Sequence, residues 1–544
     1  MFFRQAAFSF FRSRFGFQLS QLSQKKKLCY GGGFEDYNRS FNHGDPHRLW
    51  PFLSANAAIV LGINTSPILA KEVSTEENLK NVAEGADIIG LQKIEDGSVV
   101  SNIHTSKWRV FTDHARDLFL QGKLKEAEGF FLSALQEAKE GFGERDPHVA
   151  SACNNLAELY RVIKAFDKAE PLYLEAINIL EETVGRDDIR VGSALHNLGQ
   201  FYLVQRKLEE ARNFYERALK IKGRVLGLSH TDYADTMYHL GMVLYLQGKE
   251  KDAEALILDS IRILEERGQE ESILYLRRLR YLAQIYLKTN RLREVENIQR
   301  KILHTMELTK GWSSLETINA AEGLALTLQA AGNLKEAQEL LERCLDARKT
   351  LLPDDHIQIG ENMLHIARLG MLKANRLRKT DTSEAIAELD RAKDRLNDSI
   401  RIAQIFLDKL MKQRGKRQSE SEGAKKNGRE ALVILLQSFD ALGFLEITKK
   451  ELRELTQDGH SSVVEAENAL LRCISAYKRF GTERSISDAR EVKAEYLSCL
   501  KHLASLISDN ATDRTQQSRG INLQDINEEI KRLEAEVSPR RKRN

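Results

Sequence analysis

Helix-breaking residues and strand-forming segments are both scarce in this sequence. Only 7 of its 544 residues are proline, 30% are charged, and no β-rich segment stands out, which together favour a long helical protein. A single globular core is rarely this large, so an array whose core grows lengthwise fits the length better. We therefore predict an all-α fold.

Cysteine is scarce too, and it is scattered. The five cysteines stand singly, without a CxxC pair, at Cys29, Cys153, Cys344, Cys473 and Cys499. This spacing argues against a disulfide framework and against a zinc module, and the thirteen histidines do not cluster along the chain. Cys344 lies at a small-residue position of a helix and is expected to be a buried thiol. No metal site is predicted.

The familiar catalytic motifs are missing. The sequence has no phosphate loop, no nucleophile elbow, no HExxH motif and no dinucleotide fingerprint. The glycine run at 31–33 has no strand before it and no helix after it, so it does not cradle a phosphate. We therefore expect a protein that is not an enzyme and that uses neither a cofactor nor a small-molecule substrate.

Acidic residues are absent from residues 1–34, which contain six lysines and arginines. A basic, acid-free, serine-containing N-terminus is typical of an organelle transit peptide; a disordered basic arm is the alternative. Arginine and phenylalanine outnumber serine and threonine here, which favours the mitochondrion over the chloroplast. Without this segment's charge of +6, the total of +3 becomes about −3. That balance argues against nucleic acid as a partner.

Charge is also absent from residues 49–70, whose length is close to the roughly 20 residues that cross a bilayer. Pro51, Asn56, Asn64 and Pro67 interrupt its apolar character. Three interpretations stay open: a membrane anchor, a second sorting signal that would direct the protein to an intermembrane or lumenal space, and a linker. We treat residues 35–107 as a linker that contains this segment.

The chain does contain one unit that is repeated with a fixed period. A small residue recurs every 42 residues, without insertion or deletion, at Ala115, Ala157, Gly199, Gly241, Ala283, Ala325 and Ala367. A bulky residue follows three positions later in the first six units, at Leu118, Tyr160, Tyr202, Leu244, Tyr286 and Leu328. A turn such as QGK at 121–123 splits each unit into two stretches with helical spacing, which predicts pairs of antiparallel helices. Small residues recur because two helix backbones approach closely there.

Two strings within this pattern resemble a known family. NNLAELY at 154–160 and KAEPLYLEAINILEE at 168–182 resemble the tetratricopeptide repeat family, and its 42-residue form is similar to the kinesin light chain branch. The resemblance covers residues 108–401 as seven repeats. It implies a right-handed α-solenoid of antiparallel helix pairs, a tetratricopeptide superhelix, with additional helices after it.

Beyond the seventh unit the period fails. We expect a flexible loop over 412–430, because this stretch is polar and poor in apolar residues. Degenerate helical repeats are expected over 431–508, a capping helix over 521–538 and a basic tail over 539–544.

The resemblance implies a binding surface on the concave side, which the first helix of each pair lines. The candidate peptide-binding residues are Asn154, Asn155, Arg161, His196, Asn197, Gln200, Tyr238, His239, Arg277 and Arg280. The resemblance implies that Asn155 and Asn197 grip the backbone of a peptide through their amides; the alternative is that they bond the neighbouring helix.

These observations favour an adaptor or scaffold that binds a peptide segment or a protein partner, for complex assembly or recruitment inside an organelle. Two alternatives stay open. The chain could be a permanent structural subunit of an organellar complex, or a helical-repeat RNA-binding factor.

Overall fold

The computed structural model describes residues 102–414, 422–455, 464–480, 488–510 and 523–537. The predictions for 1–34, 49–70 and 539–544 lie outside these ranges. Every element within them is an α-helix, and the helices form two units, one ending at Thr305 and the other beginning at Met306. The predicted all-α fold of stacked antiparallel helix pairs is confirmed.

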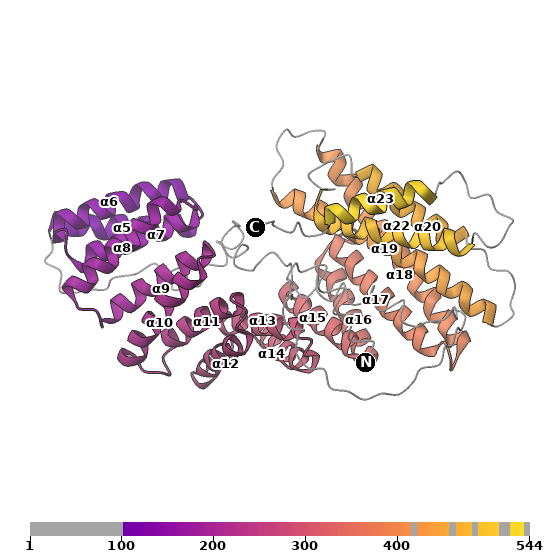
Figure 1. Cartoon of the computed structure of the whole chain (residues 1–544), viewed down its shortest axis with the longest axis horizontal. Coiled ribbons are helices and arrows are strands. Elements are labelled where there is room, and N and C mark those ends of the chain that lie inside the picture. The colour runs from indigo at the N-terminus through magenta and orange to yellow at the C-terminus, as the bar shows by residue number, and fades with distance from the viewer. Residues whose placement is uncertain (1–101, 415–421, 456–463, 481–487, 511–522, 538–544) are drawn as a thin grey trace, which may run out of the picture. The chain divides into compact units, whose positions relative to one another are not determined.

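In the first unit, each helix packs against the one before it up to α13, and the first helix α9 also touches the first helices α7 and α11 of the neighbouring pairs (Figure 1). The helices, of which the last runs past Thr305, are α5 Ile103–Leu120, α6 Leu124–Phe142, α7 Pro147–Val162, α8 Phe166–Thr183, α9 Ile189–Val204, α10 Leu208–Val225, α11 Thr231–Leu246, α12 Glu250–Glu266, α13 Ile273–Lys288 and α14 Leu292–Lys310. The odd-numbered helices come first in their pairs and the even-numbered ones second.

The second unit continues the pairing and then departs from it. Its helices are α15 Leu315–Ala331, α16 Leu334–Leu351, α17 Ile357–Leu377, α18 Thr382–Arg414, α19 Glu422–Leu455, α20 Val464–Phe480, α22 Arg490–Asn510 and α23 Leu523–Val537. Helix α19 packs against α17, α18, α20 and α22, and it is therefore the central helix of this unit.

One described stretch, Lys426–Glu454 of α19, is long and apolar enough to cross a membrane. However, 78% of its apolar window is buried inside the protein. Leu432, Leu435 and Phe439 belong to one continuous core with residues of the surrounding helices. The apolar character of α19 is therefore explained by its place in that core.

The predicted loop over 412–430 is wrong in part. Helix α18 continues to Arg414, and α19 already begins at Glu422. Alanine, lysine, arginine and glutamate, which dominate 422–431, are good helix formers. Adding residues to an existing helix costs little free energy. The helix formed by the buried part of α19 therefore continues into this polar stretch.

The cysteine spacing argues against a disulfide framework, but the structure contains a disulfide that the sequence analysis did not predict. Cys473 of α20 and Cys499 of α22 are joined, because these two helices pack against each other. Cys153 and Cys344 are free and buried, as expected for Cys344. Burial raises the pKa of both thiols to about 12, so neither is a reactive thiolate at neutral pH.

The repeated small residues lie where the two helices of a pair meet. A Cβ atom added to Gly199 would lie 3.0 Å from the ring of Tyr215 on the partner helix. One added to Gly241 would lie 2.8 Å from Ile257 Cγ1 and 3.3 Å from the carbonyl oxygen of Ala253. The glycines therefore meet a packing requirement that outweighs their helix-propensity cost of about 1 kcal/mol.

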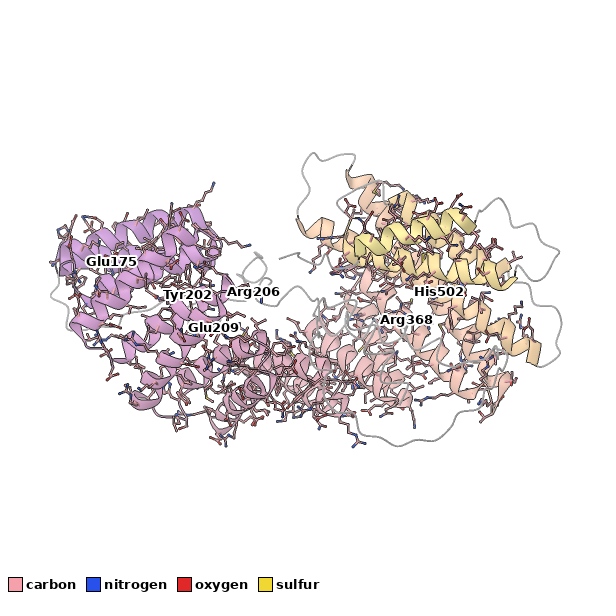
Figure 2. The ribbon with its side chains drawn as sticks, viewed as in Figure 1. Glu175, Tyr202, Arg206, Glu209, Arg368 and His502 are labelled. Atoms are coloured by element: carbon pink, nitrogen blue, oxygen red, sulfur yellow. A yellow bond between two sulfur atoms is a disulfide. The ribbon has the colours of Figure 1, made fainter. Side chains whose placement is uncertain are left out.

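The bulky residue three positions later links neighbouring pairs. Tyr160 donates its hydroxyl hydrogen to Glu128 at 2.9 Å, and Tyr202, which Figure 2 labels, donates to Glu170 at 2.8 Å, each from one pair to the pair before it. In the next unit the tyrosine is replaced by Leu244, and the position equivalent to Glu128 and Glu170 is Arg212. The tyrosine donor and the glutamate acceptor are thus replaced together, so this change leaves no carboxylate without its tyrosine partner.

We predict that Gly241→Ala destabilises the protein by about 1–3 kcal/mol, because the added methyl group overpacks the contact with Ile257. The matched control is Gly129→Ala on α6, where a Cβ would meet nothing within 4 Å. This control should stabilise the protein by about 1 kcal/mol. Urea denaturation followed by circular dichroism measures both; equal effects of the two substitutions would contradict the packing argument.

Candidate functional site

All ten predicted peptide-binding residues lie on first helices, from α7 to α13. Seven of them are buried: Asn154, Asn155, Arg161, His196, Asn197, Tyr238 and His239. Gln200 and Arg277 are half-buried, and Arg280 is exposed. The expectation that these residues form an exposed face is therefore wrong for the seven. Whether any of them binds a peptide stays a prediction.

Several of these buried side chains form hydrogen bonds with residues of their own helix or of a neighbouring helix. Asn197 of α9 donates its amide to Asn154 of α7 at 3.0 Å, so for this pair the structural alternative holds. Arg161 donates to Glu158, one turn earlier on the same helix, at 2.7 and 3.0 Å. Tyr173 of α8 donates to the same carboxylate. These side chains hold α7 to its neighbours on both sides.

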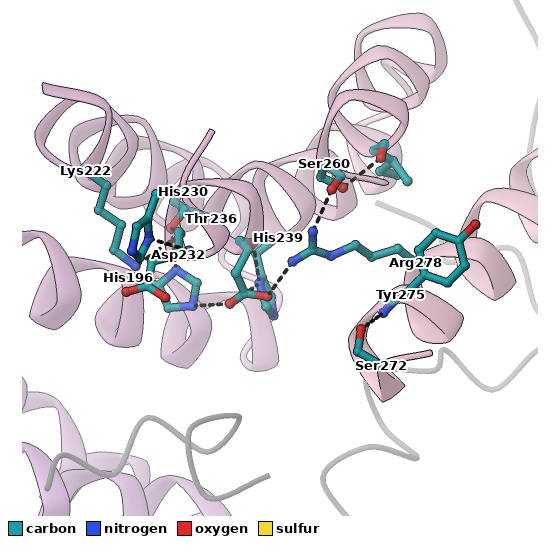
Figure 3. Close-up of polar contacts among 12 residues, drawn as sticks. His196, Lys222, His230, Asp232, Thr236, His239, Ser260, Ser272, Tyr275 and Arg278 are labelled. Carbon is teal, nitrogen blue, oxygen red and sulfur yellow. Dashed lines mark hydrogen bonds and ion pairs between the residues drawn. The ribbon is translucent and has the colours of Figure 1, made fainter. Parts of the chain in front are cut away.

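A second polar network joins three successive first helices (Figure 3). Its centre is the carboxylate of Asp235 on α11. His196 Nε2 of α9 lies 3.5 Å from Asp235 Oδ2, and His239 Nδ1 of α11 lies 3.6 Å from the same oxygen. Arg278 of α13 donates a hydrogen bond from one guanidinium nitrogen to Asp235 Oδ1 at 3.4 Å and from another to the carbonyl oxygen of Ser260 at 2.8 Å.

Two cations, Arg278 and Lys222, act on the carboxylate of Asp235. Arg278 and Lys222 are both buried, and the Lys222 Nζ atom lies 3.5 Å from the carbonyl oxygen of Asp232. Burial by itself would raise the pKa of Asp235, but His239, His196, Arg278 and Lys222 lower it below its usual value. Burial lowers the pKa of His196 well below its usual value, and Lys222 adds to this effect. Asp235 is therefore ionised and His196 neutral at neutral pH.

Although the histidines do not cluster along the sequence, the fold brings two of them together, and the described residues contain two groups of possible metal ligands. His196, Asp235 and His239 form one, and His104, Glu137 and Glu140 of α5 and α6 form the other. His196 and His239 are 43 residues apart in the sequence. Because the repeat is 42 residues long, it brings side chains at such a separation onto adjacent helices.

Several residues of these networks were not predicted, although the repeat carried a signal for them. Lys222 and Arg348 occupy one position on the second helices that other repeats fill with Ala138, Leu180 or Leu264. A charged residue at an otherwise apolar position predicts a buried counter-charge. Asp235 lies six residues before its glycine, as Arg277 lies six before Ala283, so the same rule applied to every repeat would have found it.

The second unit holds a comparable buried pair. Arg348 of α16 donates to the two carboxylate oxygens of Glu322 on α15 at 2.8 and 2.6 Å, and to Asn319 at 2.9 Å. His365 of α17 is 3% exposed, and its Nε2 atom has no hydrogen-bond partner among the described residues. Burial lowers the pKa of His365 to about 4, with Glu322 acting in the opposite direction.

Comparisons with known proteins bear on the repeats. Family models described as tetratricopeptide repeat match residues 109–182, 190–266 and 317–358. No curated protein matches the sequence.

Solved structures also resemble the chain. Nearly identical TPR-like repeats of a putative kinesin light chain from Podosopora anserina are 20% identical over 38% of this chain and 96% of that one, with a TM-score of 0.34. The apo form of RapI is 10% identical over 70% and 99%, with a TM-score of 0.41. The quorum sensor NprR from B. thuringiensis, also in its apo form, is 14% identical over 76% and 98%, with a TM-score of 0.36. At these scores the similarities carry no functional argument.

We predict that His365 contributes a loss of stability as the pH is lowered from about 6.5 towards 4. The unfolded chain takes up a proton on histidine near pH 6.5, whereas His365 in the folded protein stays neutral down to about 4. The loss is on the order of 3 kcal/mol between these limits. Urea denaturation at several pH values, compared between the wild type and His365→Gln, isolates this contribution.

The control for this measurement is His304→Gln, at an exposed position on α14. It should keep the pH dependence of the wild type, whereas His365→Gln should remove the loss that His365 contributes between about pH 6.5 and 4. Identical pH profiles for the wild type and His365→Gln would contradict the assignment.

Proposed function

We propose that this chain, which is built on tetratricopeptide repeats, is a non-enzymatic adaptor or scaffold. It binds a peptide segment or a protein partner on the first helices of its pairs and so recruits that partner to a complex. Stacked helix pairs present an extended, regular surface, which suits the capture of another chain. Function still depends on the side chains of the site, since one scaffold serves many partners.

The observation that carries this proposal is a patch on α11 and α13, which we call the basic-aromatic patch: Tyr245, Arg277, Arg280, Gln284 and Lys288. The four α13 residues follow a spacing that places them on one face of the helix. Arg280 and Lys288 are exposed, and the other three are half-buried. The Nζ atom of Lys288 lies 4.5 Å from the ring centroid of Tyr245.

The chemistry of the patch indicates the kind of partner. Tyrosine and arginine are enriched among residues that dominate protein interfaces, because they combine apolar contact area with hydrogen bonding. The three cations of the patch attract a segment that carries carboxylates. We therefore propose an acidic peptide segment as the partner. A rim of exposed charges makes such capture sensitive to salt.

We also propose a location inside an organelle, the mitochondrion first and the chloroplast as the alternative, on the basis of residues 1–34. The disulfide between Cys473 and Cys499 supports an oxidising compartment, because disulfides are rare where thiols are kept reduced. An intermembrane or lumenal space fits both features.

We predict that the double substitution Arg280→Glu with Lys288→Glu lowers capture of acidic peptides at least about tenfold, since two of the three cations of the patch are replaced by anions. The probe is a displayed library of random peptides, sorted against the immobilised full chain at low and at high salt. Peptides enriched in aspartate and glutamate should be retained by the wild type at low salt only.

The matched control reverses two exposed cations on second helices, Lys220→Glu on α10 and Lys251→Glu on α12. It changes the net charge by the same amount and should leave capture unchanged. Equal loss in both double variants would reduce the effect to net charge and contradict a site on α13. Absence of any enriched peptide would favour the permanent-subunit alternative. RNA that co-purifies with the full chain would favour the RNA-binding one.

We predict that the chain purified from its native compartment binds two fewer thiol-blocking groups when it is denatured without reductant than with it. The two protected positions should be Cys473 and Cys499, because they form the disulfide. Intact mass and peptide mapping measure the difference. Full labelling of both cysteines without reductant would contradict the oxidising compartment.

A further inference from the structure

Two histidines and one carboxylate converge between α9 and α11. His196 comes from α9, and Asp235 and His239 lie one turn apart on α11. One ring nitrogen of each histidine and one carboxylate oxygen of Asp235 all lie within 4.8 Å of one another. Such a trio of nitrogen and oxygen donors is the ligand set of many zinc sites.

The hydrogen bonds around His196 fix which of its nitrogens carries the proton. Thr236 Oγ1 lies 3.0 Å from the carbonyl oxygen of Asp232 and 3.0 Å from His196 Nδ1. A carbonyl oxygen only accepts, so the single hydroxyl hydrogen of Thr236 goes to Asp232. Thr236 then accepts a hydrogen from His196 Nδ1. In the neutral ring this leaves His196 Nε2 as the nitrogen with the lone pair.

This lone pair faces a negative charge. His196 Nε2 lies 3.5 Å from Asp235 Oδ2, so two acceptors oppose each other across that distance. A cation between them would turn this repulsion into two favourable contacts. Two donors bound at 2.0–2.1 Å to a tetrahedral zinc ion are about 3.3 Å apart, which is close to the observed separation.

His239 is held in the same manner. Its Nδ1 atom lies 2.9 Å from the backbone carbonyl oxygen of Asp235, which only accepts, so Nδ1 donates. The lone pair of His239 is therefore on Nε2, whereas the His239 nitrogen that lies 3.6 Å from Asp235 Oδ2 is Nδ1. A metal-binding histidine almost always donates its second ring nitrogen to a protein acceptor, and Thr236 and the Asp235 carbonyl supply such acceptors here.

We propose that His196, Asp235 and His239 form a binding site for a divalent transition metal of the zinc class. Two imidazoles and one carboxylate suit Zn²⁺, Co²⁺ and Ni²⁺ better than Mg²⁺ or Ca²⁺, which prefer oxygen ligands. Three protein ligands leave a fourth position for water or for a side chain of another molecule. The Asp235 side chain is 29% exposed, so this position is reachable.

The neighbouring cations set the strength of the site. Arg278 donates to Asp235 Oδ1 and leaves Oδ2 for the metal, so it holds the carboxylate without occupying the site. Its charge and that of buried Lys222 repel a metal ion. The affinity is therefore lower than that of a structural zinc site with four protein ligands.

The test uses the full chain without an affinity tag, freed of metal and titrated with Co²⁺. Visible absorption reports tetrahedral cobalt, and Zn²⁺ should displace it. We expect one equivalent of cobalt in the wild type and binding at least about tenfold weaker in His196→Gln and in His239→Gln. The control His304→Gln, at an exposed position on α14, should bind as the wild type does.

Two results would overturn the proposal. One is no tetrahedral cobalt spectrum in the wild type; the other is binding that both cluster variants retain. His104→Gln is included because His104, Glu137 and Glu140 form the second group of possible ligands, and loss of binding only there would move the site to α5 and α6. Circular dichroism reports whether each variant is folded.

X-ray absorption of the zinc-loaded wild type needs no variant. It should show two imidazole ligands with oxygen and no sulfur, and a sulfur ligand would contradict the proposal. None of these measurements involves a partner, so they stand apart from the test of peptide capture.

Discussion

The close approach of helix backbones at one repeated position is the constraint on which the described repeats depend. At Gly199 and Gly241 even a methyl group would press against a side chain of the partner helix. At Ala157 and Ala325 a methyl group is tolerated and is completely buried. Each pair closed in this way buries its remaining apolar surface by stacking on the next pair.

Once the pairs are stacked, neighbouring first helices are close enough to share hydrogen bonds. The amide of Asn197 reaches Asn154, and the imidazole of His196 reaches Thr236, each across one helix boundary. Burial makes these polar groups costly unless they are paired, so they specify how one pair sits on the next. The same proximity brings His196 to Asp235 and creates the trio that fits a metal.

The interior charges follow a second rule. Lys222 and Arg348 stand at a position that is apolar in most other repeats, and each lies near acidic residues from another helix. A lone charge at such a place would be expensive, whereas a paired one is tolerated. The repeats therefore share a backbone plan but differ in their polar interior, with the Asp235 network on α9 to α13 and the Glu158 network on α7 and α8.

The 42-residue period by itself determined the helix pairs, their order and the contact made by Gly199 and Gly241, because helix formation and pair closure depend on local spacing. It could not show that seven of the ten candidate residues are buried, since exposure depends on how neighbouring pairs lean together. It also could not show that Cys473 meets Cys499, or that Asp235 gathers two histidines, because these contacts join separate helices. Only the packing of one helix on another decided them.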